Sequence, residues 1–155
     1  MKNANKTETQ AARGLGRRLS LWHTAFVEAM HRELKHWEKH LSFEAEHLLN
    51  AAPLAMDLLI IKKDPALVID NKIAAIFRTH NIIEYKSPRD NVSIFDFNKV
   101  CGYAYIYSAI NKAPLNDITI TFIADPYPRK LFTYLGEMGC KVDETWAGIY
   151  NIRYA

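Results

Sequence analysis

Three charged residues stand out because of where they fall in the sequence. Asp57 interrupts residues 54–63, an otherwise apolar run that is typical of a buried strand. An unpaired carboxylate inside such a strand is costly unless a partner compensates it. Glu84 and Lys86 lie two residues apart in the next expected strand, so their side chains emerge from one face. Two acids on adjacent strands, with a lysine beside them, are candidates for holding a hard divalent cation.

The chemistry of such a set is well defined. Carboxylate and backbone carbonyl oxygens suit Mg²⁺ or Mn²⁺, and the ion keeps several waters that a substrate can replace. A lysine beside a metal-bound water can orient that water or stabilise a phosphorane-like transition state. The same residues have a plainer interpretation, in which Glu84 and Lys86 lie at a solvated strand end and Asp57 caps a bend.

A further acid belongs to the first expected helix, residues 17–40. Apolar residues recur there at three- and four-residue steps, which is the stripe of an amphipathic helix: Leu19, Trp22, Phe26, Ala29, Met30, Leu34 and Trp37. Glu33 falls within this stripe on a helical wheel. Its carboxylate either reaches the acidic site directly or through water, or extends from the edge of the stripe into solvent.

The remaining elements follow from apolar periodicity and turn residues. Strands are expected at residues 42–50, 54–63, 81–86 and 118–124, with a last hairpin from 141–143 and 148–154. Further helices are expected at 71–79 with Asp70 as N-cap, at 93–111 with Ser93 as N-cap, and at 129–138. Neither a linker nor an internal repeat divides residues 17–155. The order predicts a single domain of the α/β (α+β) class.

Length and composition agree with an ordinary globular domain. The chain has 155 residues, of which 49% are hydrophobic and 24% are charged, which excludes disordered, collagenous and disulfide-framework classes. No apolar run approaches the ~18–20 residues that cross a bilayer. We therefore expect a cytoplasmic protein that does not enter the membrane.

The net charge of +3 is unevenly distributed. Five basic residues against one acid give residues 1–18 a net charge of +4, which leaves −1 for the rest of the chain. Residues 1–16 are polar and lack hydrophobic periodicity, so we expect them to form a flexible basic tail. The slightly acidic body does not favour a broad nucleic-acid-binding surface, because nucleic-acid-binding domains usually present a basic face.

The Asp57 and Glu84-x-Lys86 pattern resembles the PD-(D/E)xK nuclease superfamily. Longer segments are similar to an uncharacterised bacterial family placed in that superfamily, which carries an EYKSP motif: PLAMDLLIIKK at 53–63, NIIEYKSPRD at 81–90, FDFNKVCGYAYIY at 95–107, and YPRK at 127–130. The superfamily core is a helix, three strands, a helix and a strand. The resemblance therefore implies a restriction-endonuclease-like αβββαβ core, a central mixed sheet flanked by helices.

The resemblance also implies roles for individual residues. Asp57, Glu84 and the Tyr85 carbonyl would be the metal ligands, Lys86 the catalytic lysine and Glu33 the acid of the first helix. The motif's proline departs from the usual pattern, because Pro53 lies four residues before the acid rather than directly before it.

Substrate-binding residues are expected on two other helices. Exonuclease-type branches of the superfamily carry Gln-x-x-x-Tyr after the lysine strand, and here the same spacing is Lys99-x-x-x-Tyr103, which places both residues on one helix face. Arg129 and Lys130 begin the expected helix 129–138, where a helix N-terminus can bind phosphate. The alternative for that pair is a solvated basic surface.

Together these observations predict a Mg²⁺- or Mn²⁺-dependent nuclease that hydrolyses phosphodiester bonds, with DNA as the expected nucleic acid. The alternative is a catalytically inactive nuclease-fold module that binds or regulates with a partner, as a homodimer or beside another subunit. The slightly acidic body favours that alternative.

Overall fold

The computed structural model of this chain describes residues 21–48 and 55–154. The predicted tail at 1–16 and Pro53 lie outside these residues. No helix in the described part of the chain is long and apolar enough to cross a membrane.

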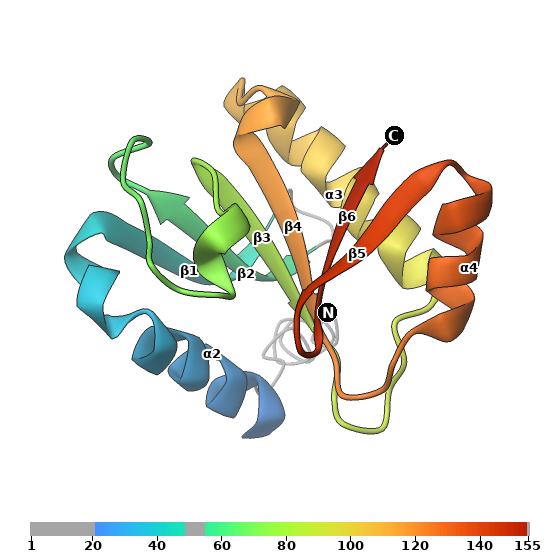
Figure 1. The fold of residues 1–155 in the computed structure, drawn as a ribbon. Coiled ribbons are helices and arrows are strands. Elements are labelled where there is room, and N and C mark those ends of the chain that lie inside the picture. The colour runs from blue at the N-terminus through green and yellow to red at the C-terminus, as the bar shows by residue number, and fades with distance from the viewer. Residues whose placement is uncertain (1–20, 49–54, 155) are drawn as a thin grey trace, which may run out of the picture.

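A mixed sheet of four strands forms the centre of the fold (Figure 1). Its strands lie in the order in which they occur in the chain: β1 (Leu41–Leu48), β2 (Ala55–Lys62), β3 (His80–Tyr85) and β4 (Ile118–Ile123). β2 is antiparallel to both β1 and β3, and β4 is parallel to β3. A parallel neighbour requires a crossover, and helix α3 (Ile94–Asn111) supplies it.

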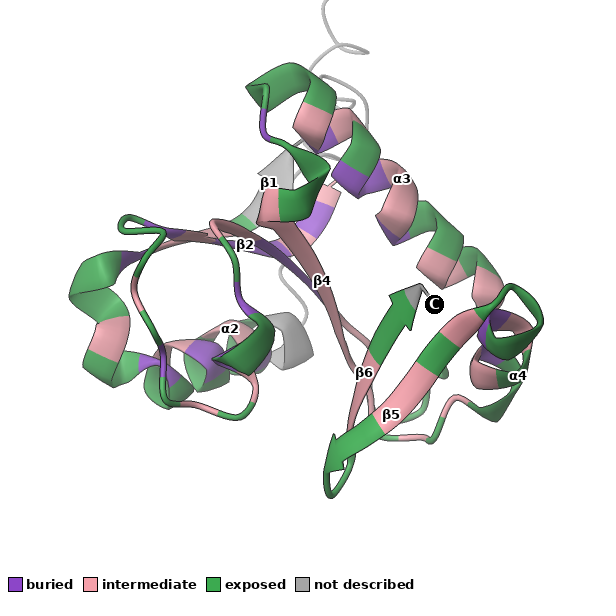
Figure 2. Cartoon of the chain, turned by 45° about the horizontal axis from the view of Figure 1, so that its top comes forward, coloured by how far each residue is buried: buried purple, intermediate pink, exposed green. Residues whose placement is uncertain are grey.

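The two faces of the sheet are covered by different helices. Helix α2 (Leu21–Glu33) packs its buried Phe26 and Met30 in one apolar cluster with Leu58 and Ile83 of the sheet. On the other face, α3 contributes to a second cluster, which contains Met56, Leu59, Ile82, Val100, Tyr103, Ala104, Tyr107 and Ala113. β3 is therefore buried on both sides. Figure 2 shows buried residues on α2 and α3.

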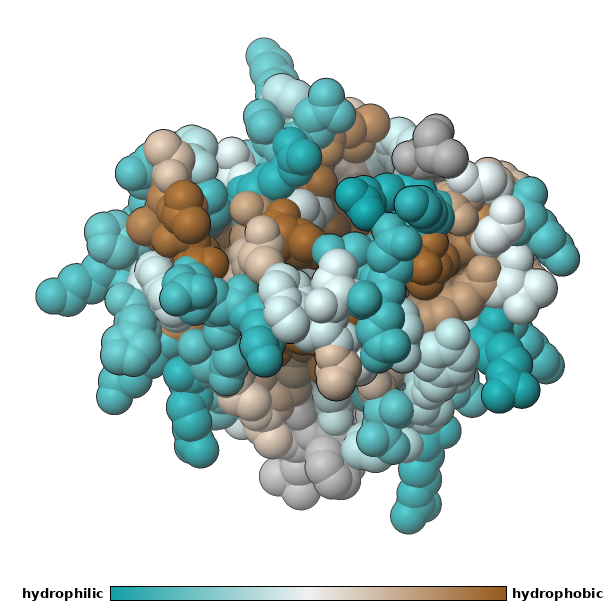
Figure 3. All heavy atoms as spheres, in the orientation of Figure 1, coloured by the Kyte–Doolittle hydropathy of each residue, from teal (hydrophilic) through white to brown (hydrophobic). Residues whose placement is uncertain are grey.

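After β4 the chain adds a helix and a hairpin. Helix α4 (Arg129–Glu137) buries Leu131 and Leu135 in a third cluster with Val92. The hairpin consists of β5 (Cys140–Trp146) and β6 (Ile149–Tyr154), which pair with each other in a separate two-stranded sheet. Figure 3 shows that apolar patches on the viewed face are interrupted by hydrophilic side chains.

The structure confirms the mixed α/β class, and the main elements from Leu21 to Ile123 occur in the predicted order of helix, three strands, helix and strand. The predicted helix 17–40 is wrong beyond Glu33. Leu34 leaves α-helical geometry with φ −102° and ψ 15°, and residues 35–40 form a 3-10 helix. Because Leu34 is fully buried, its packing overrides the helical periodicity.

The predicted helix 71–79 is also wrong, since only the 3-10 turn Ala74–Ile76 forms there. The turn's N-cap position is Ile73 rather than the predicted Asp70, and the side-chain oxygen of Asn71, just before it, accepts the N–H groups of Ile73 and Ala74. Phe77 is already extended, so the turn has no room to continue.

A buried asparagine ties the sheet together. Asn81 of β3 is fully buried, and its amide donates to the carbonyls of Ile60 and Arg78. Its side-chain oxygen accepts the Arg78 N–H and the Thr119 hydroxyl. These bonds connect β3 to β2, to β4 and to the chain before β3, and they satisfy a polar group that would be costly if left unpaired.

We therefore expect Asn81→Ala to lower the free energy of unfolding by about 2–4 kcal/mol, because a cavity forms and buried carbonyls lose their donor. Thr119→Val, which removes one of the four contacts, should cost about 1 kcal/mol or less. Urea denaturation of both variants measures the difference. Equal losses in the two variants would contradict this account.

Candidate active site

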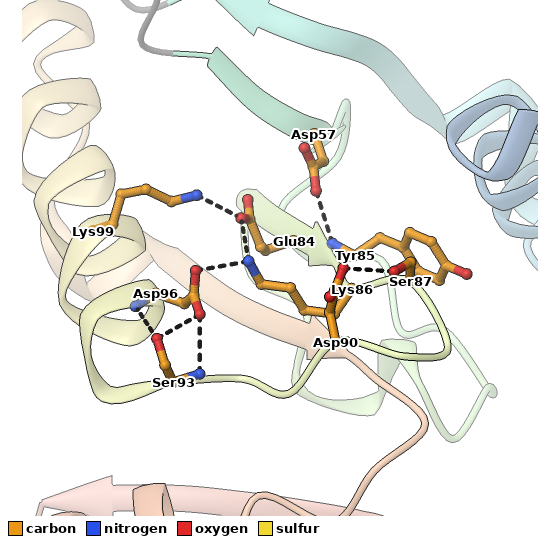
Figure 4. Close-up of polar contacts among 9 residues, drawn as sticks. All are labelled: Asp57, Glu84, Tyr85, Lys86, Ser87, Asp90, Ser93, Asp96 and Lys99. Atoms are coloured by element: carbon orange, nitrogen blue, oxygen red, sulfur yellow. Dashed lines mark hydrogen bonds and ion pairs between the residues drawn. The ribbon is translucent and has the colours of Figure 1, made fainter. Parts of the chain in front are cut away.

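The end of β3 sends successive side chains to opposite faces of the sheet. Glu84 and Lys86 point toward α3, and Tyr85 points toward α2 (Figure 4). The Tyr85 ring stacks on Phe26, with 4.8 Å between the ring centroids. The strand continues to pair just beyond its end, because the Lys86 N–H donates to the Ile123 carbonyl of β4 at 2.8 Å. This pairing holds Glu84, Tyr85 and Lys86 in extended geometry. Their side chains therefore point alternately to opposite faces of the sheet.

Glu84 is a buried carboxylate with two ammonium partners. It is only 4% exposed. Its Oε1 lies 2.8 Å from the Lys99 Nζ and 3.7 Å from the Lys86 Nζ. A carboxylate removed from water needs such partners, because its desolvation is otherwise uncompensated. The interpretation of Glu84 as a solvated strand-end residue is therefore wrong.

Lys86 also contacts an acid from α3. Its Nζ donates to the Asp96 Oδ1 at 2.7 Å. The other oxygen of Asp96, Oδ2, accepts the Ser93 N–H at 3.0 Å and the Ser93 hydroxyl at 2.6 Å. Ser93 and Asp96 form a capping box, which confirms Ser93 as the N-cap of α3.

These contacts shift two pKa values. Partial burial alone would raise the pKa of Asp96, but the hydrogen bonds from Lys86 and Ser93 outweigh it and lower that pKa to about 2. Partial burial alone would lower the pKa of Lys99, and the hydrogen bond and charge of Glu84 outweigh it, so that this pKa is raised. Lys99 stays cationic through the neutral range.

Asp57 lies where β2 and β3 stop pairing. Their last paired residues are Leu58 and Ile83. Beyond this pair the Asp57 Oδ2 accepts the Tyr85 N–H at 2.9 Å (Figure 4). The carboxylate thus replaces a backbone carbonyl at the end of the ladder, as the capping interpretation of Asp57 expects, and it also attaches Asp57 to the residue between Glu84 and Lys86.

Glu33 lies on the other side of the sheet. Its side chain is exposed, and its Oε1 accepts the Asn71 amide at 2.7 Å. It lines a hollow of about 370 Å³ together with Phe26 and Tyr85 on the α2 face. The structure therefore does not bring Glu33 together with Glu84 and Lys86, and its placement matches the alternative of a carboxylate at the edge of the helix stripe.

The expected substrate-binding residues separate into two groups. Lys99 and Tyr103 share one face of α3, as predicted, with the Lys99 Nζ 5.7 Å from the Tyr103 ring centroid. Tyr103 is buried, whereas Lys99 stands at the edge of the site. Arg129 and Lys130 are exposed at the start of α4. Among the described contacts, none joins either of them to Glu84 or Lys86.

The donor chemistry suits a hard cation. Glu84, Asp57 and the Tyr85 carbonyl supply oxygen ligands of the kind that Mg²⁺ and Mn²⁺ prefer. The Glu84 carboxylate already pairs with the ammonium groups of Lys99 and Lys86. A divalent cation bound to Glu84 would take the place of one of these ammonium groups. Within residues 21–48 and 55–154, no three His, Cys, Asp or Glu side chains are arranged to hold a metal ion. A cation bound at the Glu84 Oε1 would compete with the Lys99 ammonium, which lies 2.8 Å from that oxygen.

Asp96 is the site residue that the sequence interpretation missed. The signal was available, because Ser93 followed by an acid three residues later is a capping pattern. The sequence does not show that Asp96 lies close to Lys86, because this depends on the path of the loop between β3 and α3.

No protein-family model, curated protein or solved structure matches the chain.

The low pKa of Asp96 predicts a stability change in acid. Its folded value of about 2 lies below the ordinary value of 3.8, so the ionised form stabilises the folded state above pH 4. This contribution is lost as the pH falls from about 4 toward 2. We expect the unfolding free energy of the wild type to fall more steeply over this range than that of Asp96→Asn. Urea denaturation at pH 5, 4 and 3 measures the unfolding free energy of both proteins. An equal pH dependence in wild type and Asp96→Asn would contradict the expectation.

Proposed function

We propose that this protein is a metal-dependent phosphodiesterase of the PD-(D/E)xK type that hydrolyses nucleic acid, with DNA as the expected substrate. The observation that carries the proposal is the buried Glu84 carboxylate flanked by Lys86 on the same face of β3, with Asp57 attached to the intervening residue. A structural ion pair does not need a carboxylate at this depth, because apolar residues fill such positions at lower cost.

The arrangement of the elements supports the same class. The superfamily resemblance implies an acid on the second strand and Glu-x-Lys on the third, and Asp57 lies on β2 while Glu84 lies on β3. The sheet order and the crossover through α3 have the expected helix, three strands, helix and strand sequence. The restriction-endonuclease-like core is thus part of the proposal.

Each residue has a part in the proposed reaction. Asp57, Glu84 and the Tyr85 carbonyl would hold Mg²⁺ or Mn²⁺, which when bound activates water and neutralises charge on the phosphate. The Lys86 ammonium, 3.7 Å from Glu84, orients the attacking water and stabilises the charge that develops on the phosphoryl oxygens. Lys99, once released from Glu84, is free to contact a substrate phosphate.

The direct test is hydrolysis of single- and double-stranded DNA and RNA by the purified chain in Mg²⁺ or Mn²⁺. We expect Lys86→Ala to lower kcat by about 100-fold or more, because the charge beside the reacting phosphate is lost. Lys141→Ala, at an exposed position of β5, is the matched control and should retain wild-type activity. Negligible and equal turnover in wild type and Lys86→Ala would overturn the proposal.

A second function, an inactive binding or regulatory module, is favoured by the net charge of −1 outside residues 1–18. Calorimetric titration with Mn²⁺ separates the two functions. If the wild type binds Mn²⁺ and Asp57→Asn does not, the result supports the nuclease. The asparagine amide keeps an oxygen for the Tyr85 N–H, so the variant loses only the negative charge that would hold the metal. Absence of binding in the wild type supports the module.

Lys99 gives a sharper prediction about metal affinity. Its ammonium is 2.8 Å from Glu84 and its side chain is 42% exposed, so the pair is worth about 0.5–1 kcal/mol. We expect Lys99→Gln, which removes this competing cation, to tighten Mn²⁺ binding about two- to fivefold. Lys141→Gln is the control. Unchanged or weaker binding in Lys99→Gln would show that Lys99 does not compete for the site.

A further inference from the structure

We propose that Asp96 is a positioning residue for Lys86, and that the start of α3 thereby sets the geometry of the catalytic lysine. The inference rests on the proposed function for its catalytic meaning. It assigns a role to a residue that neither the acid–acid–lysine pattern nor the resemblance includes.

The two oxygens of the Asp96 carboxylate have separate partners. Oδ2 accepts both the N–H and the hydroxyl of Ser93, which fixes the plane of the carboxylate at the first turn of α3. Oδ1 is left facing Lys86, whose Nζ donates to it at 2.7 Å (Figure 4). The helix cap and the lysine contact are thus parts of one hydrogen-bonded unit, and the cap orients the oxygen that binds Lys86.

Lys86 needs such an anchor because it lies beyond the end of β3. A free lysine side chain samples many rotamers, whereas a catalytic group must be held within about 0.5 Å of its productive position. Lys86 is only 16% exposed and lies between two acids, at 2.7 Å from Asp96 and 3.7 Å from Glu84. The shorter contact with Asp96 keeps the Lys86 ammonium beside Glu84 without a short ion pair to it, so that Lys99, at 2.8 Å from Glu84, is the cation that a metal would displace.

α3 carries both contacts. Asp96 and Lys99 are three residues apart on this helix, so they lie one above the other on the face directed at β3. Asp96 binds Lys86 just beyond β3, while Lys99 binds Glu84 of β3. One helix face therefore holds Glu84 and Lys86 through oppositely charged groups.

The experiment compares Asp96→Asn with wild type. Asparagine keeps a side-chain oxygen for Ser93, so the cap survives, and it removes the charge that holds Lys86. We expect kcat for DNA hydrolysis to fall about tenfold or more, with KM changed by less than about twofold. The reason is that Asp96 holds the Lys86 ammonium and does not itself contact the substrate. Urea denaturation checks that the variant is folded at the assay temperature.

Asp90→Asn is the matched control, because Asp90 lies in the loop just before α3 and its carboxylate accepts from Ser87 instead of a lysine. We expect it to keep the wild-type kcat. A wild-type kcat in folded Asp96→Asn, or an equal loss in Asp90→Asn, would overturn the assignment of Asp96.

A structural readout separates this inference from the proposed function. Crystal structures of wild type and Asp96→Asn should show the Lys86 Nζ displaced from its wild-type place or spread over several rotamers in the variant. An unmoved Nζ would overturn the positioning role whether or not the protein hydrolyses DNA. Inactivity of the wild type, by contrast, would overturn the proposed function and leave the displacement of Lys86 as the test of positioning.

Discussion

The structure depends on the burial of β3 on both faces, because a strand without solvent on either side must find partners for every polar group it carries. β3 carries two fully or almost fully buried polar side chains, Asn81 near its start and Glu84 near its end. Asn81 is satisfied by neutral groups of β2, β4 and the preceding loop. Glu84 requires cations, and these come from its own strand and from α3. The first set holds the sheet together, and the second forms the candidate site.

The ionic contacts of the site form a chain from Lys99 through Glu84 and Lys86 to Asp96. Two acids and two bases balance, so the set carries no net charge. Under the proposed function, this balance lets a slightly acidic body accommodate an anionic substrate. In the proposed reaction, positive charge reaches the phosphate locally, from the bound metal and from lysines already in place, and a broad basic surface is not needed.

Much of the fold was predictable because strand signals are local. Asp57 and Glu84 lie on strands, as predicted, and Lys86 follows directly after β3, where its N–H still pairs with β4. Errors occurred where tertiary packing competes with periodicity, as at buried Leu34. Glu33 shows the same limit: a helical wheel places it on the apolar stripe, but it cannot tell which side of the sheet that helix will cover. Asp96 was missed because its contact with Lys86 spans the turn between two elements.

The stacking of Tyr85 on Phe26 has a consequence for how this protein tolerates change. Tyr85 is bonded to its neighbours Glu84 and Lys86 along the backbone, yet its ring belongs to the apolar layer under α2. The end of β3 thus separates the charged set on the α3 side from the apolar contacts of Tyr85 on the α2 side. Substitutions that repack α2 can accumulate on one side while the charged set persists on the other. Substitutions in the layer under α2 can therefore change thermal stability without touching the ionic contacts on the α3 side.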